Sequence, residues 1–155
     1  MQISDIITPE RILCHVQATS KKRSLEYFSK LLATESTLTS HEIFDSLLAR
    51  ERLGSTGLGK GVAIPHARVA LNHVTLAAFL QLEKGIDFDA IDKQPVDLLF
   101  ALMVPENSTQ EHLKILAQLA SMFSDAEFRR KIRETDDCFE KFNLLTGWQP
   151  PPDLL

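Results

Sequence analysis

Hydrophobic residues recur along the chain with two different spacings, which predict a mixture of helices and strands. After Ser20 and again after Thr39, apolar positions repeat every three or four residues, the spacing of one buried helix face, and Thr39 with Glu42 forms a capping box. Three apolar runs at 11–16, 74–82 and 96–104 instead predict strands, and the last barely alternates, as expected of a strand buried on both faces. The C-terminal third returns to the helical spacing.

Capping boxes place the starts of the C-terminal helices. Ser108 with Glu111 and Ser124 with Glu127 predict two helix starts, and a last short helix is expected before Gly147. For the first of these helices the apolar spacing predicts a buried stripe of four residues, Leu113, Leu116, Ala117 and Ala120.

The order of these elements predicts the fold class. Helices before, between and after the strands indicate an α/β protein, a single domain with a central mixed β-sheet flanked by helices on both faces. The connection between 74–82 and 96–104 is too short for a helical crossover, so these strands should be antiparallel or not adjacent. We expect the domain to cover residues 1–147, followed by a loose, proline-rich tail over 148–155 with Trp148 packed back on the domain.

Composition and charge narrow the function. The chain has 44% hydrophobic and 25% charged residues and a formal net charge of -4, which is ordinary for a globular protein and argues against nucleic-acid binding. Its apolar runs are too short to insert in a membrane and its start lacks a signal-peptide pattern, so we expect a cytoplasmic protein.

The residues that commonly bind metals are scattered. Cys14 and Cys138 lie far apart in sequence in apolar surroundings and are expected to be free, buried thiols. His15, His41 and His73 show no paired ligand spacing, so we predict no metal site and no cofactor, and assign these three histidines structural roles.

A glycine-rich segment is the strongest candidate for chemistry. Four of the six glycines fall within 54–61, and a short apolar run then leads through Pro65 to His66. Glycine allows backbone amides to approach an anion closely, so we expect His66 to carry a phosphoryl group beside a phosphate-binding loop. The expected loop groups are the hydroxyls and amides of Ser55, Thr56, Gly57 and Gly59.

A nucleotide-binding P-loop is the first alternative for this segment. Gly54, Gly59 and Lys60 match most of its pattern, but Gly61 stands where the magnesium-binding Ser or Thr belongs. The order is also inverted, because this loop follows a helix and enters a strand. The sequence therefore argues against nucleotide binding.

A longer pattern is typical of a known family. It begins with an acidic or amide residue, which is followed by six residues of any type and then by an apolar and a small residue. After two more residues of any type, it ends with the sequence apolar-Ala-apolar-Pro-His-small. Every place is satisfied, by Glu51, Leu58, Gly59 and Val62-Ala63-Ile64-Pro65-His66-Ala67. In this the chain resembles the mannitol, fructose and nitrogen-regulatory type of IIA protein of the bacterial phosphotransferase system. The likeness extends over 48–57 and from 88 to 113, where it is most similar to the nitrogen-regulatory branch.

The resemblance implies a phosphotransferase component with a phosphohistidine intermediate. His66 would accept the phosphoryl group, as tele-phosphohistidine, from an HPr-like phosphocarrier, called NPr in the nitrogen branch. Arg50, in the last turn of a helix, would neutralise phosphate charge, and His112 matches the family's second active-site histidine. Relatives are tied to nitrogen metabolism and potassium transport.

Three functions stay open on the sequence. Phosphate can pass from His66 to a downstream acceptor such as a sugar-specific IIB domain, or phosphorylation can switch which regulator the protein binds. The glycine loop can also hold an anion without phosphorylation of His66. One local conflict is expected at Ala67, where relatives often have glycine, because a left-handed backbone there would be strained by the methyl group.

Overall fold

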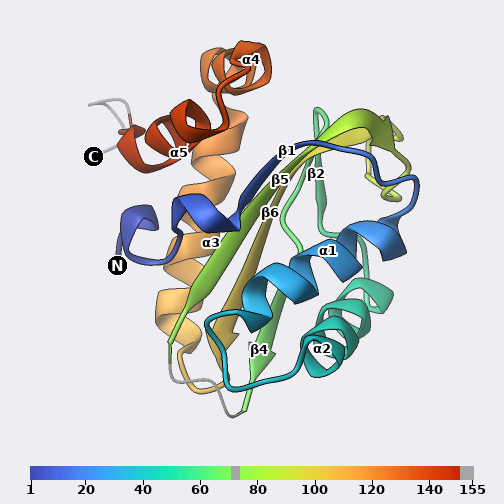
Figure 1. Cartoon of the computed structure of the whole chain (residues 1–155), viewed down its shortest axis with the longest axis vertical. Coiled ribbons are helices and arrows are strands. Elements are labelled where there is room, and N and C mark those ends of the chain that lie inside the picture. The colour runs from blue at the N-terminus through green and yellow to red at the C-terminus, as the bar shows by residue number, and fades with distance from the viewer. Residues whose placement is uncertain (71–73, 151–155) are drawn as a thin grey trace.

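A mixed six-stranded sheet forms the centre of the molecule in a computed structural model, which describes residues 1–70 and 74–150 (Figure 1). The strands follow the spatial order β1-β5-β6-β3-β2, and β4 also pairs with β6. β5 and β6 are antiparallel, whereas β1 runs parallel to β5, and β3 and β4 run parallel to β6. Their bounds are β1 Ile12–Val16, β2 Gly57–Gly59, β3 Val62–Ala63, β4 His66–Val69, β5 Leu76–Ile86 and β6 Val96–Pro105.

Helices cover both faces of this sheet (Figure 1). α1 and α2 pack on one face, and α3, α4 and α5 together with the short 3-10 turn η1 pack on the other. Their bounds are η1 Ile3–Asp5, η2 Pro9–Arg11, α1 Lys21–Ala33, α2 Ser40–Arg52, α3 Thr109–Ser124, α4 Ala126–Glu134 and α5 Cys138–Gly147. The predicted fold class, an α/β domain with a mixed sheet between helical layers, is confirmed.

The period of two along the central strands explains the two cores. In β5, Ala78 and Leu80 face the layer of α1 and α2, whereas Ala77 and Phe79 face the layer of α3 and α4. β6 alternates in the same way with all of its side chains apolar except Asp97, as a strand buried on both faces requires. Because helices cover both faces of the sheet, a functional site is expected at its edges and in its loops.

Two predicted helix starts on the first layer are confirmed. The Ser20 hydroxyl accepts the Arg23 N–H at 3.1 Å, and Thr39 and Glu42 form a reciprocal capping box. At α4 the prediction is wrong: the cap is Asp125, whose side chain accepts from Glu127 and Phe128, while Ser124 ends α3. Ser108 does precede α3, but its side chain makes no capping hydrogen bond.

The predicted buried stripe of α3 is out of phase. Leu113 is 65% exposed and Ala117 is also exposed, whereas His112, Ile115 and Leu119 are buried. The spacing predicted the wrong face because apolar residues occupy two neighbouring faces of this helix. Which of the two faces is buried depends on how the helix packs against the sheet. As a consequence His112 points inward and Leu113 faces solvent.

The two cysteines form a disulfide, so the prediction of free thiols is wrong. Cys14 in β1 and Cys138 at the start of α5 are joined across 124 residues of sequence, with their Cα atoms 6.0 Å apart. Packing of α5 against the edge strand β1 brings them together. Sequence separation carries no information about that contact.

Trp148, the residue after α5, is bonded to the start of α4. The Trp148 Nε1–H donates to Asp125 at 3.1 Å, which confirms that this side chain packs back on the domain. Residues 151–155 of the predicted tail lie outside the described residues, as does His73.

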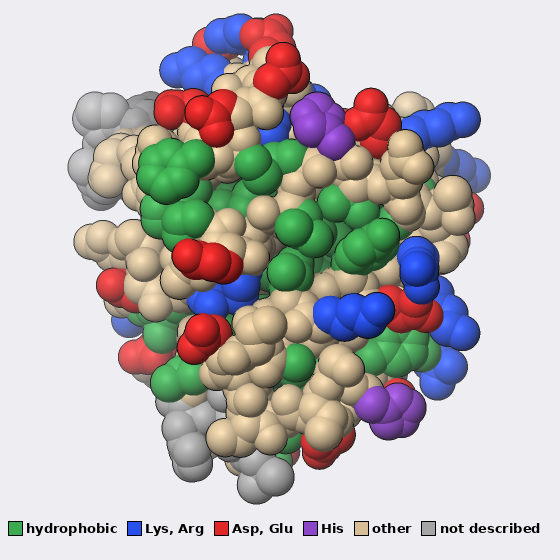
Figure 2. All heavy atoms as spheres, in the orientation of Figure 1, with side chains coloured by type: hydrophobic (Ala, Val, Ile, Leu, Met, Phe, Trp, Pro, Cys, Tyr) green, Lys and Arg blue, Asp and Glu red, His purple; other side chains and the backbone are tan. Residues whose placement is uncertain are grey.

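Charges of both signs are interspersed on the face shown in Figure 2, around hydrophobic side chains in the area of β1 and α5. This face therefore offers no continuous basic surface of the kind that binds nucleic acids. In the described part of the chain, no helix combines the length and the apolar character needed to cross a membrane.

Candidate functional site

The glycine-rich segment is tied to the end of α2 by two neighbouring side chains. Arg50 donates to the Gly54 carbonyl at 2.8 Å. The Glu51 carboxylate accepts the Thr56 N–H at 2.7 Å and the Thr56 hydroxyl at 2.9 Å. The chain then forms the β2–β3 hairpin and reaches His66, the first residue of β4.

His66 is held in one tautomer. Its Nδ1 lies 2.8 Å from the Ile64 carbonyl oxygen, and a carbonyl can only accept, so Nδ1 carries the proton and Nε2 carries the lone pair. Burial lowers the pKa of His66 below its usual value, and the positive charges of Arg50 and Arg68 act in the same direction. The ring is therefore neutral and nucleophilic at Nε2.

His112 lies beside it, in the first turn of α3. The two imidazole centroids are 5.3 Å apart, with the rings inclined by 51°. His112 is 8% exposed, and its Nδ1 is buried without a hydrogen-bond partner among the described residues. Burial lowers the pKa of His112 to about 4, with further contributions from His66, Arg68 and Arg50, so this ring is also neutral.

Both histidines line an open cavity of about 910 Å³. Two arginines, Arg50 from α2 and Arg68 from β4, share it, so the cavity collects positive charge beside an open imidazole nitrogen. Two leucines of its lining are strongly exposed, Leu53 at 85% and Leu113 at 65%. The complete lining is Ser46, Ala49, Arg50, Leu53, His66, Ala67, Arg68, Glu106, His112, Leu113 and Leu116.

Arg68 is the residue that sequence reasoning missed. His66 and Arg68 are two residues apart in β4, so their side chains emerge on the same side of the strand. The sequence could have indicated Arg68. If the apolar run is interpreted as a strand that continues past Pro65, residues 66 and 68 lie on the same side of that strand.

The structure does not bring the four predicted phosphate-binding loop residues to this cavity. Ser55 donates to the Phe88 carbonyl at 2.6 Å and accepts the Gly57 N–H, and both polar groups of Thr56 are bound to Glu51. Gly57 and Gly59 belong to β2, and neither lines the cavity. The polar groups of this loop serve its own conformation.

The remaining histidines with described positions lie elsewhere. His15 pairs with Glu83 at 2.9 Å on the surface, and His41 with Asp45 at 3.3 Å. The strain expected at Ala67 is absent, because Ala67 lies in β4 and is not among the residues with positive φ. The left-handed positions of the hairpin are Gly59, Lys60 and Gly61 instead.

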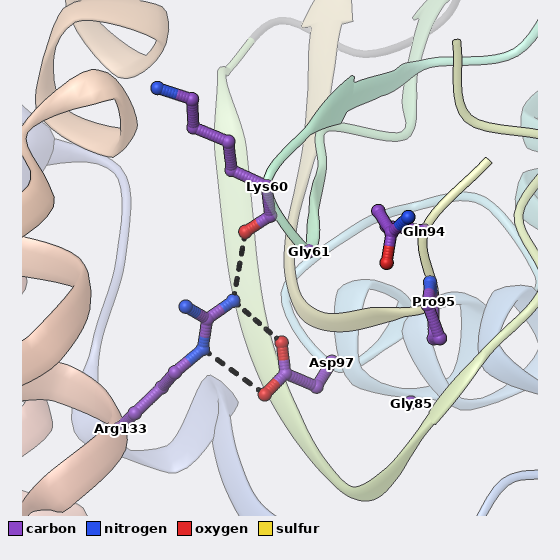
Figure 3. A pocket seen from close by; sticks show the side chains of 7 residues that line it. All are labelled: Lys60, Gly61, Gly85, Gln94, Pro95, Asp97 and Arg133. Carbon is purple, nitrogen blue, oxygen red and sulfur yellow. Dashed lines mark hydrogen bonds and ion pairs between the residues drawn. The ribbon is translucent and has the colours of Figure 1, made fainter. Parts of the chain in front are cut away.

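A second cavity, of about 390 Å³, lies at the other end of the hairpin (Figure 3). Arg133 donates there to both carboxylate oxygens of Asp97, at 2.8 and 3.2 Å, and to the Lys60 carbonyl at 2.9 Å. Its charge is therefore matched by a carboxylate, and its donors are engaged. The cavity around His66 is the better anion site, because no ion pair of Arg50 or Arg68 is found among the described residues, although Glu106 also contributes to the lining.

The chain is similar to known proteins over nearly its whole length. The chain is 46% identical over 150 residues to a nitrogen regulatory protein of Pseudomonas aeruginosa, covering 96% of this chain and 97% of the relative. It is 42% identical over 156 residues to the nitrogen regulatory protein of Escherichia coli, covering 99% and 94%. The crystal structure of the nitrogen regulatory protein IIA-Ntr from Neisseria meningitidis superposes with a TM-score of 0.90 at 42% identity, covering 93% of this chain and 99% of that one. Residues 5–146 match the family described as phosphoenolpyruvate-dependent sugar phosphotransferase system, EIIA 2, and the chain belongs to this family of phosphotransfer components.

Proposed function

We propose that His66 accepts a phosphoryl group on Nε2 from an HPr-like phosphocarrier. The observation that carries this proposal is the hydrogen bond from Nδ1–H to the Ile64 carbonyl, because it leaves the lone pair on Nε2. In the transfer, a bond forms between Nε2 and phosphorus while the bond from phosphorus to the donor breaks. The imidazole gains positive charge, and the Ile64 carbonyl stabilises it through the same hydrogen bond.

The charge of the transferring group is met by side chains. Arg50 and Arg68 approach from two different elements and neutralise the phosphoryl oxygens, and His112 supplies a neutral ring 5.3 Å from the nucleophile. The glycine loop acts indirectly, by fixing Arg50 through the Gly54 carbonyl.

We further propose that the phosphate serves mainly as a switch, with the nitrogen-branch phosphocarrier NPr as donor and regulators of nitrogen metabolism or potassium transport as partners. The support is that full-length relatives at 42–46% identity are nitrogen regulatory proteins. A phosphoryl group adds about -1.5 to -2 charges. This offsets the charges of Arg50 and Arg68, and because Glu106 also lines the cavity, its net charge turns from positive to negative for any partner that docks there. The alternative is onward transfer to a sugar-specific IIB domain.

The first test is phosphorylation in vitro. The protein is incubated with phosphoenolpyruvate, enzyme I and HPr, or with their nitrogen-branch equivalents, and its intact mass is measured at neutral and acidic pH. We expect a gain of one acid-labile phosphoryl group that His66→Ala abolishes and that the surface variant His15→Ala retains. No gain with either donor set would leave a passive anion-binding domain as the function.

A second experiment separates the switch from the relay. Phosphorylated and unphosphorylated protein are each immobilised and used to capture partners from an extract, and onward transfer to a sugar-specific IIB domain is measured in parallel. A switch predicts partners bound in one phosphorylation state only, whereas rapid transfer to the IIB domain would support the relay.

A further inference from the structure

A continuous set of hydrogen bonds connects a buried carboxylate to the nucleophile. Glu51 is 6% exposed and holds both the N–H and the hydroxyl of Thr56, which is equally buried. The Thr56 carbonyl accepts the Ile64 N–H at 3.1 Å, across the hairpin of β2 and β3. The Ile64 carbonyl, on the opposite side of the same residue, accepts the His66 Nδ1–H at 2.8 Å.

From this connection we infer that Glu51 is a positioning residue for phosphoryl transfer: through Thr56 and Ile64 it fixes the orientation and the Nδ1–H tautomer of His66. The role in transfer rests on the proposed function, but the effect on the tautomer does not. Glu51 does not line the cavity of His66. Burial is the main cause of the lowered pKa of His66, and the Glu51 charge acts against it through space. The hydrogen bonds through Thr56 and the backbone of Ile64 are a separate route, and only this route fixes the tautomer.

The environment of Glu51 suits this task. A buried carboxylate is costly unless it is paired and hydrogen-bonded, and Lys21 lies 3.8 Å from Glu51 while also pairing with Asp89 at 3.0 Å. Lys21 is itself packed 4.8 Å from the centroid of the Phe88 ring. The carboxylate is thereby anchored to α1 and to the loop before β6. Thr56 is held by its hydrogen bonds to this anchored carboxylate.

The hydrogen bonds also explain why an acidic or an amide residue satisfies the first place of the family pattern. Each offers a side-chain oxygen that accepts the Thr56 N–H, whereas an alanine would leave that N–H and the adjacent hydroxyl buried without a partner. The requirement at this place is therefore for a hydrogen-bond acceptor, which both residue types provide.

The test compares Glu51→Ala with Glu51→Gln by 15N NMR of the His66 imidazole and by the rate of phosphoryl acceptance. We expect wild type and Glu51→Gln to show the Nδ1–H tautomer, and Glu51→Ala to show a mixture of tautomers. Acceptance should slow by roughly tenfold to a hundredfold in Glu51→Ala, mainly in the maximal rate and not in the KM for the donor, because the nucleophile is misoriented.

Asp92 supplies the matched control. Its carboxylate accepts the Lys60 N–H at 2.8 Å at the far end of the same hairpin, but Lys60 is not connected to Ile64 by these bonds. Asp92→Ala should therefore leave the His66 tautomer unchanged. If Glu51→Ala does not fold, Thr56→Val, which loses the hydroxyl bond and keeps the N–H bond, carries the same comparison with a smaller shift expected.

The outcomes separate the two proposals. A wild-type tautomer and rate in Glu51→Ala would overturn the positioning role, as would an equal change in Asp92→Ala. If Glu51→Ala changes the tautomer while wild type accepts no phosphate from any donor, the positioning of His66 stands and the proposed function fails.

Discussion

At the scale of single residues, the site combines two neutral imidazoles with two cations. Burial and the nearby arginines lower the pKa of both His66 and His112, so both rings stay neutral. The same arginines supply positive charge that stabilises an incoming phosphoryl group. The same positive field therefore serves both purposes, preserving the nucleophile and attracting its substrate. Removal of either arginine should therefore slow phosphoryl acceptance.

Arg50→Ala should slow phosphoryl acceptance by roughly a hundredfold and Arg68→Ala by about tenfold. Arg50 also holds the Gly54 carbonyl, so its loss disturbs the loop as well as the charge, whereas Arg68 is exposed and contributes charge screened by water. Rates measured with the phosphocarrier at low and at high salt would check this. Arg23→Ala, which removes a surface arginine paired with Glu26, is the control and should have no effect.

The pH dependence of phosphoryl acceptance follows from the lowered pKa of His66. Because the neutral ring is the nucleophile, the rate should stay constant as the pH falls through 6.5, the usual value for histidine, and decline only below the lowered pKa. A titration of His66 by NMR and a rate profile between pH 5 and 8 should give the same midpoint. A midpoint at or above 6.5 would contradict the lowered pKa.

His112 should make the folded protein less stable as the solution becomes acidic. The unfolded imidazole takes up a proton near pH 6.5, whereas the folded one does so only near 4, so unfolding is favoured as the pH falls across that window. The loss approaches roughly 3 kcal/mol at the lower end. Urea unfolding at pH 7.5 and 4.5 should show it, and His112→Gln should reduce the difference by that amount.

At the scale of elements, the β2–β3 hairpin is fixed at both ends. Glu51 holds its start through Thr56, and near its tip Asp92 accepts the Lys60 N–H while Arg133 donates to the Lys60 carbonyl. The glycines of this hairpin allow left-handed backbone conformations and close packing. Gly61, for example, has a φ of 80° and lies against the Arg133–Asp97 ion pair (Figure 3).

Gly61→Ala should destabilise the fold by about 1–3 kcal/mol. The added methyl group would approach Asp97 to 3.0 Å and displace the Arg133 guanidinium, in a backbone conformation that alanine rarely adopts. Thermal or urea unfolding measures the effect. Gly147→Ala is the matched control, since nothing lies within 4 Å of a Cβ there, and a stability loss as large as that of Gly61→Ala would argue against this account.

At the scale of the whole molecule, patterns in the sequence predicted what depends on local spacing. The sheet with helices on both faces, the capping box at Thr39 and the candidate His66 follow from spacing and motif, whereas Arg50 and His112 were predicted from the family resemblance. The structure brings these three side chains to one cavity. The rest depends on which segments meet in space. Nothing local pairs Cys14 with Cys138, and although Glu51 and Thr56 are only five residues apart, no helix or strand spacing predicts the turn that joins them.

The disulfide gives the last prediction, because it joins the edge strand β1 to α5 and closes most of the chain into one loop. Reduction should lower the free energy of unfolding by roughly 2–4 kcal/mol, since the unfolded chain regains freedom. Urea unfolding with and without reductant measures this difference. A Cys14→Ser, Cys138→Ser double variant should have the same free energy of unfolding as the reduced protein, and reductant should not change it. β1 and β4 lie on opposite sides of the β5–β6 pair, so phosphoryl acceptance by His66 should change by less than about twofold on reduction. Alkylation of two thiols in unreduced, denatured protein would contradict the bond.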